Sequence, residues 1–140
     1  MAIPLLEAKN LKKYFKESNV FAVNGVSLTV GNAQTLGIVG ESGCGKSTLA
    51  KLLLGLLPLE NGEVFFQGEK IDFSKRKPLL FFRKKVQAVF QEPFLSLDPQ
   101  MSVASILSEP FKVFGNSDRI FIKGKVKELL DQVDLPFHFS

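Results

Sequence analysis

Cysteine, histidine and long apolar runs are scarce in this 140-residue chain, and each scarcity excludes a class of protein. The single cysteine, Cys44, excludes an intramolecular disulfide and fits a reducing compartment. The longest apolar tract, 49–59, is interrupted by Lys51, Gly55 and Pro58 and is far too short to span a bilayer. The start of the chain lacks the basic residues and apolar core of a secretory signal peptide. We therefore expect a soluble chain in the cytoplasm.

The residues that are abundant indicate a globular chain with a modest excess of positive charge. Hydrophobic residues make up 45% of the sequence and include 14 phenylalanines, most of which we expect in a core. The net charge of +4 includes two short basic clusters, 75–77 and 83–85. Neither cluster is interleaved with the aromatic residues of an RNA-binding motif, which favours solvated charge on a loop and a helix face. We therefore expect no nucleic-acid partner.

A glycine-rich stretch, GESGCGKST at residues 40–48, matches the phosphate-binding P-loop pattern. Its glycines let the backbone curl tightly, so that several N–H groups converge on phosphate oxygens. A helix starting near Lys46 would add its own unsatisfied N–H groups and the positive end of its dipole. Lys46 would reach the β- and γ-phosphates of a nucleotide, and the Ser47 hydroxyl would bind Mg²⁺.

The flanks of this loop predict a strand–loop–helix unit, the context that a P-loop requires. Residues 35–39 are predicted to form a short buried strand, and an apolar stripe at helical spacing follows the loop. A plain glycine turn is the weaker interpretation because both the motif and its context match. Cys44 is expected to fill space in the loop, since the only histidine, His138, lies at the far end of the chain. The apolar stripe that follows the loop at helical spacing consists of Leu49, Leu52, Leu53 and Leu56.

Strand-like sequence lies on both sides of the loop. The 39 residues before Gly40 form a β layer that a small P-loop kinase would normally lack. Tyr14, at the end of the first strand, could stack on an adenine base, although on its own it would be interpreted as an ordinary half-buried strand aromatic. The predicted strands cover residues 5–15, 21–30, 63–67 and 86–90, with turns at Asn61–Gly62 and Gly68.

Helical sequence follows Gln91. Two amphipathic helices are predicted there, and Pro110 should kink the first of them. Their apolar positions are Val103, Ile106, Leu107, Phe111 and Phe114, then Val126, Leu129, Leu130 and Val133.

Taken together, these stretches resemble the nucleotide-binding subunit of an ATP-binding cassette (ABC) transporter. The stretch at residues 86–103 resembles the oligopeptide and dipeptide importers in particular. The resemblance implies an α/β P-loop NTPase fold with an N-terminal antiparallel β layer, a P-loop core and the start of a helical subdomain. The matching stretches are LKKYF (11–15), FAVNGVSL (21–28), LGIVGESGCGKSTLAKLLLGLLP (36–58), GEVFFQGEKI (62–71) and VQAVFQEPFLSLDPQMSV (86–103).

The resemblance also assigns roles to individual residues, with ATP and Mg²⁺ as cofactors. Tyr14 matches the adenine-stacking aromatic, and Gln91 matches the Q-loop glutamine, whose amide oxygen can bind Mg²⁺ or position a water. Ser47 and Gln91 are thus the expected metal ligands. The expected nucleotide-binding residues are Tyr14, Gly40, Glu41, Ser42, Gly43, Cys44, Gly45, Lys46, Ser47, Thr48 and Gln91.

Domain organisation and partners follow from the same resemblance. Residues 1–140 are expected to form the N-terminal part of one ABC ATP-binding domain, with the β layer and P-loop core at 5–90 and the Q-loop and helical subdomain at 91–140. The segment after Gln91, 92–101, is expected to contact transmembrane permease subunits. A second ATP-binding subunit would complete the dimer, held at the inner face of the membrane.

The family's remaining motifs, the Ser-Gly-Gly-Gln signature, the Walker B aspartate with its catalytic glutamate, and the switch histidine, do not occur in this sequence. Residues 131–134 continue a helical pattern and are not a Walker B strand. We therefore expect an N-terminal portion that binds ATP, does not hydrolyse it alone and is only marginally folded alone, with Ile38, Val39 and the stripe of Leu49, Leu52, Leu53 and Leu56 partly exposed. A self-sufficient P-loop kinase or NTPase, and a non-catalytic fragment that contacts membrane subunits, are the alternatives.

Overall fold

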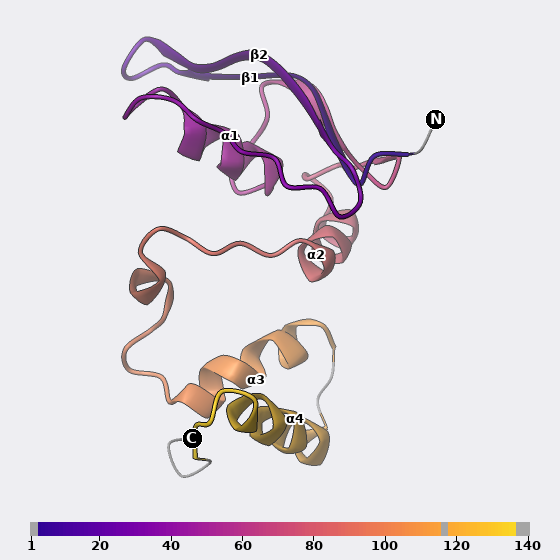
Figure 1. Ribbon diagram of the computed structural model, residues 1–140, viewed down its shortest axis with the longest axis vertical. Coiled ribbons are helices and arrows are strands. Elements are labelled where there is room, and N and C mark those ends of the chain that lie inside the picture. The colour runs from indigo at the N-terminus through magenta and orange to yellow at the C-terminus, as the bar shows by residue number, and fades with distance from the viewer. Residues whose placement is uncertain (1–2, 116–117, 137–140) are drawn as a thin grey trace. The chain divides into compact units, whose positions relative to one another are not determined.

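The computed structural model describes residues 3–115 and 118–136 and divides the chain into two compact units, Met1–Gln87 and Ala88–Ser140 (Figure 1). His138, to which the sequence assigns no catalytic part, lies outside the described residues.

The first unit is built on a four-stranded antiparallel sheet in the order β2-β1-β3-β4. The long strands β1 (Leu6–Phe15) and β2 (Val20–Val30) form a hairpin. The shorter strands are β3 (Asn61–Phe66), which begins inside the predicted turn, and β4 (Glu69–Lys70). This sheet confirms the N-terminal antiparallel β layer that the resemblance implies.

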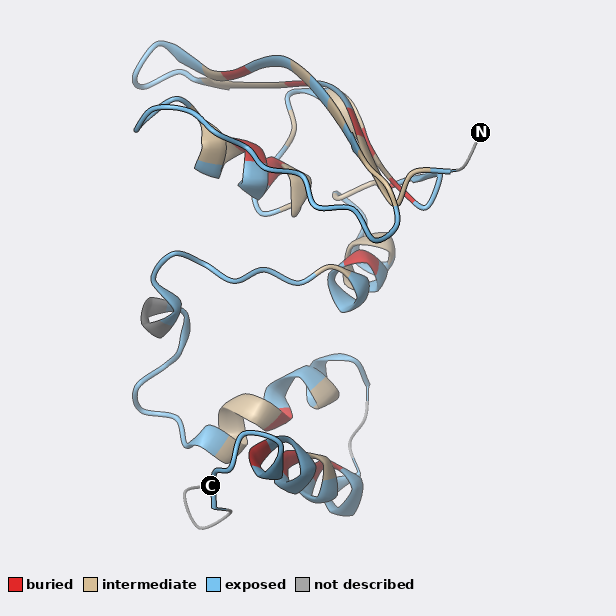
Figure 2. Ribbon diagram, in the orientation of Figure 1, coloured by how far each residue is buried: buried red, intermediate tan, exposed pale blue. Residues whose placement is uncertain are grey.

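Helix α1 (Lys46–Leu53) packs on one face of this sheet and forms the main core (Figure 2). Leu49 and Leu52, at the predicted helical spacing, are buried, and Leu53 is half-buried. Leu56 lies beyond the end of α1 and is 44% exposed, so the apolar stripe is shorter than predicted. The sheet contributes Ala8, Leu11, Val23 and Val64 to this core.

The predicted strands at 35–39 and 86–90 are wrong for this structure. Both segments are irregular, and Val39 and Val89 are 96% and 94% exposed. A strand of this apolar kind is stable only when neighbouring strands bond to its backbone and other elements cover its faces. No described segment pairs with either stretch. The expected exposure of Ile38 and Val39 is confirmed, but the expected exposure of the leucine stripe is wrong for Leu49 and Leu52, which pack in the core against the sheet.

Helix α2 (Arg76–Lys85) is an element that the sequence patterns did not predict. It buries Phe82 in a second small core with Phe66 and Ile71. The Phe82 ring lies edge-on to Phe66 and Phe73, with centroids 5.5 and 5.4 Å apart. The basic residues at both ends of α2 stay exposed, in keeping with the solvated charge expected there.

The second unit contains a short 3-10 turn, η1 (Pro93–Ser96), and the helices α3 (Val103–Val113) and α4 (Arg119–Asp131). Ser102 and Asp118 cap the two helices by accepting backbone N–H bonds. Both helices were predicted, and α3 contains Pro110. Asp131 is the last residue of α4 and residues 132–134 form a turn, so residues 131–134 are not a strand. The apolar core of this unit consists of Ile122, Val126 and Leu130, packed against Ala104, Leu107 and Phe111.

Within the described ranges, no helix is long and apolar enough to cross a membrane.

Candidate functional site

The phosphate loop ends where α1 begins, at Lys46, as the sequence predicts. Gly45 is the N-cap residue with φ 97°, and no side chain in the described part of the molecule caps the helix. The first helical hydrogen bond runs from Leu49 N to Gly45 O at 2.8 Å. The N–H groups of Lys46, Ser47 and Thr48 therefore have no acceptor within the helix. Such a helix start attracts an anion.

The Lys46 ammonium lies across its own loop. Its Nζ donates to the Gly40 and Glu41 carbonyl oxygens at 2.7 and 2.6 Å and lies 3.6 Å from Cys44 Sγ. The carbonyl bonds keep the cation beside the uncapped helix start. Phosphate oxygens, which are charged, are stronger acceptors for an ammonium than neutral carbonyls are.

Cys44 occupies the space that Gly40 leaves open. A Cβ built on Gly40 would lie 2.6 Å from Cys44 Sγ, well inside contact distance. The Cys44 side chain is exposed to solvent and accepts the weak bond from Lys46. These contacts fit the predicted loop-filling part for this cysteine.

Gly45 lets the β1–β2 hairpin approach the loop closely. A Cβ on Gly45 would lie only 2.0 Å from the Ala22 carbonyl oxygen, which belongs to strand β2. Gly45 also has a positive φ, as does Gly43 at 80°. Only glycine combines this backbone conformation with so short an approach.

A cavity of about 330 Å³ lies between the hairpin and the loop. This volume is at the lower end of the range for small-molecule sites. Among the described residues, Lys46 is the only charged one that lines this cavity, so the cavity is suited to an anion. The loop contributes Gly43, Gly45, Lys46, Ser47 and Thr48, and the hairpin contributes Phe15, Ser18, Val20 and Ala22.

Tyr14 does not line this cavity, although the sequence assigned it to the site. Its ring packs on Phe21 with centroids 4.8 Å apart, and its hydroxyl hydrogen-bonds the Asn19 side chain. The neighbouring residue Phe15 lines the cavity instead. Sequence reasoning missed the hairpin residues because their approach to the loop depends on tertiary packing. The adjacent aromatic residues Tyr14 and Phe15 were the one sequence signal for this wall of the cavity, but the sequence does not show which of the two rings faces the loop.

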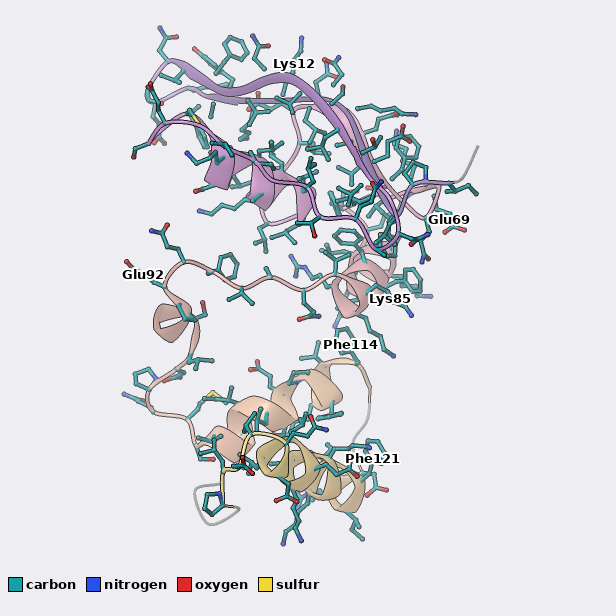
Figure 3. The ribbon with its side chains drawn as sticks, viewed as in Figure 1. Lys12, Glu69, Lys85, Glu92, Phe114 and Phe121 are labelled. Carbon is teal, nitrogen blue, oxygen red and sulfur yellow. The ribbon has the colours of Figure 1, made fainter. Side chains whose placement is uncertain are left out.

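The remaining predicted site residues contribute in different ways. The backbone carbonyls of Gly40 and Glu41 accept hydrogen bonds from Lys46. The Ser42 side chain is exposed and lies outside the cavity wall. Gln91 belongs to the second unit, where it is exposed and precedes Glu92, which is labelled in Figure 3. Ser47, the other expected metal ligand, belongs to the first unit.

Glu60 fixes the end of β1 that leads into the hairpin turn. Its Oε1 accepts a bond from Lys13 Nζ at 3.1 Å, and its Oε2 accepts one from the Tyr14 backbone N–H at 3.0 Å. The Lys13 hydrogen bond holds the pKa of the Glu60 carboxyl below its ordinary value of 4.5, with help from the Tyr14 N–H and the charges of Lys13 and Lys16.

We expect Glu60→Gln to lower the melting temperature slightly at neutral pH. A lowered pKa in the folded state means that the carboxylate stabilises the fold above pH 4.5 and loses this effect as the pH falls through the folded pKa. The two melting temperatures should therefore converge in acid. Thermal unfolding of both proteins from pH 7 downward measures this, and a difference that persists below the Glu60 pKa would contradict it. The effect is small because exposed ion pairs contribute little.

Comparison with known proteins places the chain in a family. The profile of the ABC transporter family matches residues 23–138. The oligopeptide transport ATP-binding protein AppF of Bacillus subtilis is 40% identical over 97% of this chain and 44% of its own length. OppF of the same organism is 46% identical over 78% of this chain and 37% of its own length. The chain thus spans less than half the length of the curated relatives it matches.

Solved structures agree with this relationship. The dimeric post-hydrolysis structure of the ATP-binding cassette MJ0796 with ADP and Pi is 26% identical, with a TM-score of 0.75 over 96% of this chain and 60% of that one. The cbiO1 protein of Clostridium perfringens, part of the ABC transporter complex cbiONQ, shares the fold at 24% identity, with a TM-score of 0.71 over 97% of this chain and 52% of that one. On the combined match of profile, relatives and fold, this chain belongs to the ABC transporter family.

Proposed function

We propose that this chain binds Mg-ATP through its phosphate loop, as part of the ATP-binding subunit of a peptide importer. The observation that supports this most is the cavity in which the Lys46 ammonium and three uncapped N–H groups meet. A cation and convergent backbone donors without a carboxylate suit a polyphosphate. The relatives' names as oligopeptide transport ATP-binding proteins support peptides as the transported class.

The residues present fit ATP and its metal ion. Lys46 would leave the loop carbonyls and donate to the β- and γ-phosphates, while the N–H groups of Ser47 and Thr48 bind phosphate oxygens. The Ser47 hydroxyl is an oxygen donor of the kind that Mg²⁺ prefers, and Gln91 would be a second ligand in the assembled site. The metal ion would neutralise charge on the phosphates.

In the complete protein, we propose, nucleotide binding and hydrolysis drive transport through partner subunits. The segment 92–101 would contact transmembrane permease subunits, and a second ATP-binding subunit would complete the dimer. The MJ0796 cassette, which is described as dimeric, supports the second of these partners. This arrangement would hold the chain at the inner face of the cell membrane.

Calorimetric titration tests the proposal, with ATP added in excess Mg²⁺ and again in EDTA. We expect the wild-type chain to bind ATP more tightly with Mg²⁺. Ser47→Ala should lose most of this metal-dependent gain and keep its affinity in EDTA, because only the hydroxyl ligand is removed. Thr29→Ala is the control, since the exposed Thr29 hydroxyl lies near the end of β2, whereas the residues of β2 that line the cavity lie at its start. A Ser47→Ala protein with an undiminished Mg²⁺ effect would exclude Ser47 as a metal ligand, and a wild-type chain that binds no ATP would overturn the proposed function.

A further inference from the structure

Helix α2 and the residue before it carry a concentration of positive charge that the proposed function does not use. Six of the 18 lysines and arginines of the chain lie at 75–77 and 83–85, and no acidic residue occurs between Asp72 and Glu92. The rest of the chain has 12 basic and 14 acidic residues, so the net charge of +4 comes from this one segment. A local field of one sign attracts a partner of the opposite sign.

One face of α2 is packed against the protein, and the opposite face is exposed. Phe82 is only 1% exposed and lies in the second small core, with Val86 packed beside it (Figure 2). Since an α-helix has 3.6 residues per turn, the outer face of α2 is formed by Arg76, Lys77, Leu80, Phe81 and Lys84. All five are exposed except Leu80, which is half-buried.

Phe81 is the residue on this face that solvated charge does not explain, because it is 51% exposed. Residues three and four positions apart are neighbours on a helix, so Lys77, Lys84 and Lys85 surround the Phe81 ring. Lys85 is labelled at the end of α2 in Figure 3. An exposed ring among lysines suits the surface of a bilayer, where cations bind lipid phosphates and an aromatic side chain enters the boundary of the acyl chains.

Helix α4 shows how the charge of α2 differs from ordinary surface charge. It also carries lysines, but Lys125 Nζ donates to Glu128 Oε2 at 2.6 Å. Asp118 caps the start of α4, and Asp131 is its last residue. Acidic residues therefore offset much of the positive charge of α4, whereas α2 contains none.

A nucleic acid is the other polyanion that a basic helix attracts, but the apolar residues of this face do not favour it. Proteins that bind single strands present several aromatic rings on which successive bases stack. The outer face of α2 has one ring, Phe81, and its apolar neighbour Leu80 is aliphatic. An aliphatic and an aromatic side chain together are better suited to acyl chains.

We propose that the outer face of α2 binds the surface of an anionic phospholipid bilayer. Its cations contact the lipid phosphates, and the Phe81 ring enters the boundary between headgroups and acyl chains. This contact goes beyond the proposed function, in which partner subunits hold the chain at the membrane. It also does not depend on the nucleotide site, because no residue of α2 lines that cavity.

Vesicle binding by the full chain tests the role of the cations. We expect binding to vesicles of phosphatidylcholine with phosphatidylglycerol, none to phosphatidylcholine alone, and a loss of binding as salt is added. A lysine near an anionic surface contributes about fivefold to the partition constant. The combined variant Lys77→Gln, Lys84→Gln, Lys85→Gln should therefore bind roughly 100-fold more weakly.

The matched control removes the same net charge from three exposed lysines on other elements. It combines Lys9→Gln on β1, Lys16→Gln after β1 and Lys51→Gln on α1. We expect its vesicle binding to stay close to that of the wild type. Equal losses in the two triple variants would mean that net charge alone attracts the chain, which would overturn α2 as the docking surface.

Phe81 is tested by two substitutions at the same position. Phe81→Ala should weaken vesicle binding roughly 4- to 12-fold without a change in charge, because about half of the ring is available for burial. The chain has no tryptophan, so Phe81→Trp supplies a single fluorescent reporter. Its emission should shift to the blue on anionic vesicles and be quenched by lipids brominated on their acyl chains. Phe21→Trp, at a position on β2 that is 59% exposed, should remain unquenched.

Three results would overturn the proposal and leave the nucleotide site untouched. The first is a wild-type chain that binds both kinds of vesicle equally or neither, and the second is a vesicle-bound Phe81→Trp protein whose emission is not quenched. The third is Phe81-dependent binding to a single-stranded oligonucleotide without binding to vesicles, which would assign this face to nucleic acid. Titration with Mg-ATP should give the same affinity in the α2 variants and the wild type, so a chain that binds vesicles but no ATP would contradict the proposed function alone.

Discussion

Gly45→Ala is expected to destabilise the first unit by about 2–5 kcal/mol and to open the cavity. An alanine with this positive φ costs about 1–2 kcal/mol. Its Cβ would also lie 2.0 Å from the Ala22 carbonyl oxygen, and a backbone atom cannot move aside cheaply. Relief of such overpacking typically costs about 1–3 kcal/mol more. The hairpin must move away from the loop, so nucleotide affinity should fall together with stability.

Gly43→Ala is the matched control for this effect. Gly43 also has a positive φ, 80°, but a Cβ there would meet no atom within 4 Å. Gly43→Ala should therefore destabilise the fold only by the strain of an alanine with positive φ, about 1–2 kcal/mol. Chemical denaturation of both variants and the wild type measures the difference. Equal losses in the two variants would mean that the hairpin does not rest on Gly45.

The parts of the site that the sequence predicted depend on local chain geometry. The glycine pattern of 40–48 and the leucine spacing after it determine a curled loop followed by a helix, and both are found with α1 beginning at Lys46. The apolar patterns of 5–15 and 21–30 likewise predict two strands, found as β1 and β2. Neighbouring residues determine these features, so they can be inferred without knowledge of the rest of the chain.

The parts that the sequence did not predict depend on distant partners. Residues 35–39 have the composition of a buried strand, but strand formation depends on partners that this pattern cannot supply. Helix α2 is stabilised by Phe82 packing on Phe66, a contact that joins segments far apart in the sequence. The choice between Tyr14 and Phe15 depends on a register shift and on the approach of Ala22 to Gly45, which no local pattern records.

Lys46→Ala is expected to weaken Mg-ATP binding by roughly 10²- to 10⁴-fold. The variant loses two charge-assisted hydrogen bonds to the β- and γ-phosphates, each of which contributes about 1.5–3 kcal/mol. Folding should be largely unaffected, because the Gly40 and Glu41 carbonyls that Lys46 now bonds belong to exposed residues and can be hydrated. The loss should be larger than for any single change in the hairpin wall.

Lys51→Ala is the control, since Lys51 is an exposed lysine on the same helix and lies outside the cavity wall. It removes the same charge from the chain, so any long-range effect of net charge on an anionic ligand is common to both variants. Titration with Mg-ATP and with tripolyphosphate should show a large loss of both ligands in Lys46→Ala and little change in Lys51→Ala. Tripolyphosphate is decisive here, because a residue that contacts only phosphate must affect both ligands alike. Similar ATP affinities in the wild type and Lys46→Ala would mean that the loop does not hold the phosphates.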